Sequence, residues 1–148
     1  MILDKNLKFA DALDVSAATG TALVGDVIDL TANAVNPGRG QPIYLVIQVT
    51  TAFTSGTSSD VTFQLASDSV AAIATNGTQT VHYVSDTFDE SELPVGTVLT
   101  IALPQGRNYE RYLGLQVVTA GAATTAGAIS AFLVWDVQNN DSYPDAVN

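Results

Sequence analysis

Short runs in which apolar and polar residues alternate recur along nearly the whole chain, and residues that favour turns bound each run. An alternation with a period of two places apolar side chains on one face of a β-strand and polar side chains on the other. The clearest run covers residues 43–51, where Ile43, Leu45, Ile47 and Val49 share a face. The same pattern predicts further strands over residues 24–30, 61–65, 98–103, 112–119 and 128–137.

A hairpin is also predicted around Asn76-Gly77, because both residues tolerate the positive φ that a two-residue turn requires. In such a hairpin Thr75 pairs with Thr78, and Ala71 pairs with His82. About seven or eight strands separated by turns, without a helical pattern, predict an all-β sandwich or barrel.

The length of 148 residues suits a single domain, and a chain of that size can bury its core without disulfide bonds, which agrees with the absence of Cys. Within this domain, residues 1–148, we expect two irregular ends. Residues 1–20 are interpreted as an N-terminal arm, and residues 138–148 as a polar C-terminal tail.

The charge balance restricts the partners of the chain. Five Lys and Arg residues against fifteen Asp and Glu residues give a net charge of 5 − 15 = −10, and the few cations are scattered. Such a surface repels nucleic acid and anionic membranes, so neither is expected as a direct partner. The sequence also has no signal peptide and no apolar run of the roughly 20 residues that a membrane helix needs. We therefore expect the protein to act where it is made, or to be assembled into a structure there.

Few residues could carry out chemistry. His82 is the only histidine and there is no Cys, so the sequence predicts no enzyme activity, no cofactor and no zinc site. The carboxylates of Asp86, Asp89, Glu90 and Glu92 are hard oxygen ligands that leave a weak calcium site open. Their spacing fits no calcium loop, and a solvated acidic turn is the preferred interpretation.

Residues 108–112 place two tyrosines around Glu110 and Arg111 at the start of a predicted strand. Tyr and Arg are enriched where proteins contact one another, so this segment is either an ordinary strand start or a contact site.

Four segments resemble a known family. Residues 38–49, 108–113 and 127–138, together with the opening residues 2–11, are similar to the corresponding stretches of the Bbp16-like capsid decoration proteins of tailed bacteriophages. The resemblance covers most of the chain in order and is weakest over residues 67–94. It implies a jelly-roll fold, a position on the exterior of the virion capsid after synthesis in the host cytoplasm, and a cementing role between major capsid subunits. It also implies homo-oligomers, with a homodimer favoured and a trimer possible, and no catalytic residues.

From residue type and expected exposure, we predict that the contacts with the capsid or between subunits are made by Ile2, Leu3, Lys5, Lys8, Phe9, Arg39, Tyr109, Arg111 and Tyr143. The alternative function is a carbohydrate-binding or adhesin-like β-sandwich. That function needs an exposed aromatic platform, and Trp135 is expected on an apolar face of the last strand, which counts against it.

Overall fold

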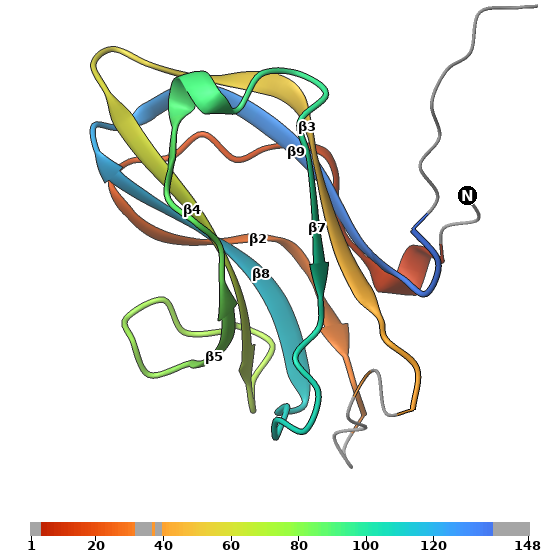
Figure 1. Ribbon diagram of the computed structural model, residues 1–148. Helices are drawn as coiled ribbons and strands as arrows, with labels where there is room; N and C mark the ends of the chain where they lie inside the picture. The colour runs from red at the N-terminus through yellow and green to blue at the C-terminus, as the bar shows by residue number, and fades with distance from the viewer. Residues whose placement is uncertain (1–3, 32–36, 38–39, 138–148) are drawn as a thin grey trace, which may run out of the picture.

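The computed structural model describes residues 4–31, 37 and 40–137. Two antiparallel β-sheets pack face to face (Figure 1). The strands are β1 (Lys8–Asp14), β2 (Gly20–Asp29), β3 (Tyr44–Ser55), β4 (Ser59–Asp68), β5 (Thr80–Val84), β6 (Phe88–Asp89), β7 (Val98–Ala102), β8 (Tyr112–Gly121) and β9 (Thr124–Val134). Two short 3-10 turns, η1 (Lys5–Leu7) and η2 (Glu90–Glu92), complete the described elements. None of the described residues form a helix long and apolar enough to cross a membrane.

The strand order identifies the fold. One sheet has the order β1-β9-β3-β7, and the other has the order β2-β8-β4-β5, with β6 also pairing with β4. Consecutive strands therefore alternate between the two sheets except at β4, β5 and β6, which share one sheet, and the first and last strands are neighbours. This is the connectivity of a jelly roll, so the predicted all-β jelly-roll sandwich is confirmed.

The core lies between the sheets and follows the alternation in the sequence. Leu45, Ile47 and Val49 of β3 are at most 1% exposed, and Leu113 and Leu115 of β8 are fully buried opposite them. The rings of Phe53 and Phe63 meet edge to face with their centroids 6.2 Å apart. Each such side chain stabilises the fold by about 1.5–3 kcal/mol when it leaves water.

The N-terminal arm is only partly as expected, because residues 8–14 form strand β1 and pair with β9. Phe9 is 1% exposed and belongs to the core. Two register shifts interrupt the pairing, and Ala12 has a positive φ of 46°. These irregularities break the period of two, which explains why the alternation does not reveal this strand.

The hairpin predicted at Asn76-Gly77 is wrong. Strand β5 pairs with β4 through contacts such as Leu65↔Tyr83, and residues 69–79 form a loop between them. This loop covers the outer face of the second sheet, where Ile73 is 4% exposed above Gly114. A Cβ atom at Gly114 would lie 2.6 Å from Cδ1 of Ile73, so only glycine leaves room for this close contact.

Candidate binding surface

Two of the predicted contact residues, Lys5 and Lys8, line one depression, and a third, Arg111, bonds to a residue of its lining. The depression is lined by Lys5, Asn6, Lys8, Asp26, Val27 and Asp29. Arg111 joins this group because its guanidinium donates two hydrogen bonds to the carboxylate of Asp29, with Nε–Oδ1 and Nη2–Oδ2 distances of 3.0 and 2.9 Å. The structure thus brings Arg111 to the same side of the molecule as Lys5 and Lys8, from which it lies more than 100 residues away in the chain. We call these three cations with Asp26 and Asp29 the mixed-charge patch.

The charges of this patch are partly compensated within the chain. Nζ of Lys8 lies 2.7 Å from Oδ2 of Asp11, and the hydrogen bond from Arg111 lowers the pKa of Asp29. Both partners of each ion pair are solvent-accessible, so the pairs contribute little to stability. They leave Lys5 as an exposed cation on a strongly acidic molecule.

The prediction of a surface contact is wrong for Phe9 and Tyr109. Phe9 is buried in the core because β1 joins the sandwich. Tyr109 is 4% exposed, its hydroxyl donates to the carbonyl oxygen of Pro104 at 2.7 Å, and its ring stacks on His82 with 4.2 Å between centroids. Their side chains are occupied inside the fold, so neither can present a binding surface. The four remaining predicted contacts, Ile2, Leu3, Arg39 and Tyr143, lie outside the described residues.

His82 has a hydrogen-bond partner that sequence spacing did not reveal. Its Nε2 lies 2.7 Å from Oγ of Ser67, which also accepts a hydrogen bond from the backbone N–H of Glu110 at 3.0 Å. The Ser67 hydroxyl therefore has its own proton free to donate to a neutral His82 ring. Burial, followed by the positive charge of Arg107, lowers the pKa of His82. Ser67 is fully buried, so this pair acts as a structural link between β4, β5 and β8 and not as an accessible nucleophile and base.

The acidic segment at residues 86–92 is ordered by its own carboxylates. Asp89 accepts from the backbone N–H of Ser91, and Glu92 accepts from the backbone N–H of Asp89, which together cap η2. Glu90 accepts from the N–H of Ser59 at 2.6 Å and from Oγ of Ser55 at 2.9 Å. The hydroxyl of Ser91, followed by its backbone N–H, lowers the pKa of Asp89, and the bonds from Ser59 and Ser55 lower the pKa of Glu90. These bonds hold η2 against β3 and β4 and point the carboxylates at different donors, and the described residues contain no cluster of three or more metal-ligating side chains.

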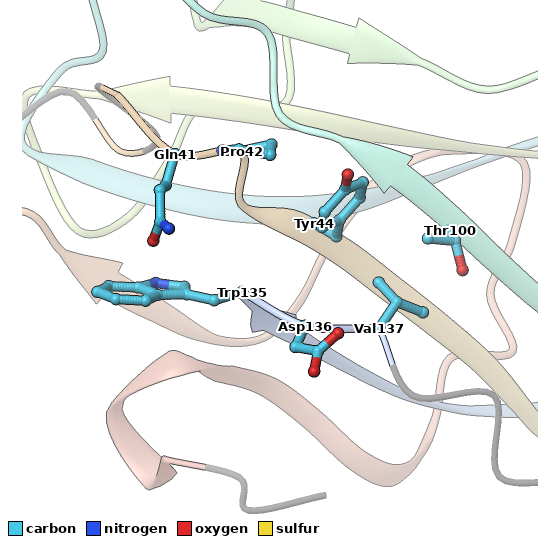
Figure 2. A pocket seen from close by; sticks show the side chains of 7 residues that line it. All are labelled: Gln41, Pro42, Tyr44, Thr100, Trp135, Asp136 and Val137. Carbon is cyan, nitrogen blue, oxygen red and sulfur yellow. The ribbon is translucent and has the colours of Figure 1, made fainter.

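A second surface lies on the outer face of the β1-β9-β3-β7 sheet. Val46, Phe132 and Val134 form an apolar cluster there with Tyr44, separate from the main core. Beside it is a depression of about 550 Å³, lined by Gln41, Pro42, Tyr44, Thr100, Trp135, Asp136 and Val137 (Figure 2). Figure 2 shows the Gln41 side chain extending toward the indole of Trp135, with Tyr44 and Thr100 on adjacent strands beyond them.

The position of Trp135 corrects the expectation from the sequence. Strand β9 ends at Val134, so Trp135 leaves the sheet and its side chain is 67% exposed. The alternation extends beyond the end of the strand in the sequence, and it gave no indication of where hydrogen bonding stops. An aromatic ring is therefore available at this surface after all.

No curated protein matches this chain. The model of one protein family, described as Bbp16, matches residues 9–133. This match runs from the second residue of β1 to the penultimate residue of β9 and so includes both sheets and the strand pairings that define the sandwich. The chain belongs to the Bbp16 family.

Proposed function

We propose that this protein is a capsid decoration, or cement, protein of a tailed bacteriophage. It binds the outer surface of the major capsid shell as a homo-oligomer and links neighbouring capsomers. The observation that carries this proposal is the match of the Bbp16 family model across the whole sandwich. The segments compared in the sequence analysis resemble phage capsid decoration proteins of the same family name.

The character of the molecule supports a structural role. The jelly roll offers a densely packed framework, and the carboxylates of Asp89 and Asp29, whose pKa values are lowered, are engaged in a cap and an ion pair. The net charge of −10 favours the exterior of a shell over an interior filled with DNA, which repels an acidic surface. We propose no catalytic role and no cofactor.

The mechanism of stabilisation is linked binding. A protein that binds the assembled shell but not the separated subunits stabilises the shell by about 2.7 kcal/mol per site at a free concentration of 100 times Kd. An oligomer that contacts two capsomers gains further, because its second contact forms at a high effective concentration. The mixed-charge patch is the proposed capsid contact, together with Ile2, Leu3, Arg39 and Tyr143.

The direct test uses capsids that lack the protein. Purified protein is added back, and binding to the outer surface is located by cryo-electron microscopy while calorimetry records the capsid melting temperature. We expect density on the exterior between capsomers and an increase in melting temperature. Equal melting temperatures with and without saturating protein would contradict a cementing role.

A carbohydrate-binding function is a second candidate, favoured by one observation. Exposed Trp135 shares its depression with the polar side chains of Gln41 and Asp136, as sugar-binding sites often require. Trp135 is the single tryptophan of the chain, so its fluorescence reports directly on this depression. A saturable change in that emission with a defined glycan, together with a loss of the binding heat in calorimetry for Trp135→Ala, would support this candidate.

A further inference from the structure

Strand β7 is an open edge of the first sheet. It pairs with β3 over five consecutive residues, from Tyr44↔Ala102 to Gln48↔Val98, without a register shift. Its sequence, Val98-Leu99-Thr100-Ile101-Ala102, contains no charge, no proline and no glycine. Within the part of the chain that the structure describes, no strand pairs with the other side of β7. A regular, uncharged edge of this kind is a template for another strand.

The other edges of the sandwich carry features that discourage pairing. Strand β1 has two register shifts and the Lys8–Asp11 ion pair. Strand β2 has a register shift after Val24 and the charged residues Asp26 and Asp29. The pairing of β5 with β4 shifts after Leu65. Among the edge strands that the structure describes, β7 alone combines a regular register with the absence of charge, so it differs from the other edges by more than its position.

The direction of the free backbone groups follows from the register. Leu103 donates its N–H to the carbonyl of Ile43, and Val49 donates to the carbonyl of Thr97, so odd-numbered residues of this segment face β3. In an antiparallel ladder the residues between them direct both N–H and C=O away. Val98, Thr100 and Ala102 therefore present their backbone donors and acceptors to the open side. All three residues are exposed.

We propose that this edge is the surface through which a second copy of the chain joins, which gives the oligomer of the proposed function a specific interface. An antiparallel copy related by a twofold axis places Thr100 opposite its own equivalent and Val98 opposite Ala102. The twofold axis repeats the second pairing, so there are three pairs, and each can exchange two hydrogen bonds, about six in total. The result is one continuous sheet with four strands from each copy.

Charge makes a second copy a suitable occupant of this edge. Two molecules with a net charge of −10 repel each other over most of their surfaces, and β7 offers a contact without charged side chains. Val98, 52% exposed, would be covered by the partner. Pro94 and Pro104 flank the strand and lack backbone donors, so the pairing stays short, and the twofold axis closes it as a dimer.

The test substitutes the central residue. Thr100→Pro removes an N–H that faces the open side and leaves the hydrogen bonds to β3 in place, as proline at a strand edge permits. Thr100→Val is the matched control, because it keeps the backbone donor. Sedimentation velocity of purified protein should show a dimer for the wild type and for Thr100→Val. For Thr100→Pro the dimer dissociation constant should rise about thirtyfold or more, with an unchanged far-ultraviolet circular dichroism spectrum.

A second variant covers the case in which proline disturbs the strand. Thr100→Lys keeps the backbone donor and places two cations opposite each other in the twofold arrangement, so it should also give monomers, and added salt should partly restore the dimer. A wild-type monomer, or a dimer unaffected by both substitutions, overturns the proposal. Capsid binding is measured separately. Dimers that ignore capsids contradict the proposed function alone, and a monomeric wild type that binds capsids through β7 contradicts the dimer alone.

Discussion

His82 and its neighbours join three strands through one small cluster of side chains. Ser67 on β4 bonds the imidazole on β5, and Tyr109, just before β8, stacks on the ring. The cluster favours a neutral ring, because burial disfavours the charged form and lowers the pKa of His82. Protonation of His82 would therefore disturb a contact that links β4 and β5 to the segment before β8.

We predict a loss of stability on mild acidification. The pKa of His82 is lowered from its ordinary value of 6.5 in the folded protein, so the unfolded chain binds a proton at higher pH than the folded chain does. Stability should be full above pH 6.5 and fall as the pH decreases through the folded pKa. Urea unfolding between pH 7.5 and 5 should show this slope, and His82→Gln should flatten it. An equal slope in the variant would contradict the role of His82. The carboxylates with lowered pKa values lose their contribution only at lower pH.

A second prediction concerns Gly127, which has φ of +151° and packs against the ring of Phe53. A Cβ atom there would lie 2.6 Å from Cδ1 of Phe53, so Gly127→Ala forces a core aromatic ring to move. We expect a loss of about 1–3 kcal/mol in the free energy of unfolding. Gly56→Ala is the control, since no heavy atom lies within 4 Å of its added Cβ and its φ lies outside the positive range that disfavours residues with a side chain. Similar urea midpoints for both variants would contradict this account.

Among the elements of the fold, the loop of residues 69–79 depends on buried amides for its position. Gln116, fully buried on β8, donates to the carbonyl of Ala74 at 2.8 Å and accepts from Gln64 at 2.7 Å. These bonds satisfy polar groups that would otherwise be buried without partners under the loop.

Gln116→Leu should therefore destabilise the fold by about 1–3 kcal/mol, because it leaves the amide of Gln64 and the carbonyl of Ala74 without partners. Hydrogen exchange should increase over residues 69–79 more than over β8 itself. The control is Gln79→Ala, whose longer 3.3 Å contact with Gln116 is near the surface. Uniform exchange changes across the whole sandwich would argue against a local role for the amide pair.

The elements also show what sequence periodicity can predict. Strands β3, β4, β7, β8 and β9 keep the period of two over their central residues, and the predictions at residues 43–51 and 112–119 are confirmed. The period of two does not predict the structure where bulges interrupt β1. It also misses Ile73, which is buried although it lies in a loop and not in a strand. Of the predicted contact residues, Lys5, Lys8 and Arg111 are at the surface. Tyr109 is buried against His82, and the sequence alone does not reveal that these two residues meet in the folded protein.

For the whole molecule, the distribution of charge distinguishes a specific capsid contact from general electrostatics. Lys5 belongs to the mixed-charge patch, whereas Arg107 is an exposed cation of the loop between β7 and β8. Reversal of either charge changes the net charge by the same amount.

Lys5→Glu should therefore weaken capsid binding by about tenfold or less, with a steeper effect at low salt, while Arg107→Glu should leave binding nearly unchanged. The measurement is co-sedimentation of labelled protein with capsids at several salt concentrations. Equal losses for both variants would show that only the total charge matters, and would remove the patch from the proposed contact.

The pairing of Lys8 with Phe132 places the beginning of the first strand beside the end of the last one. Peptides introduced just before β1 and just after β9 would consequently begin at neighbouring points, within reach of a single antibody. The same proximity would allow a short linker to join the end of β9 to the beginning of β1 in a circular permutant, with new ends opened in the loop of residues 69–79.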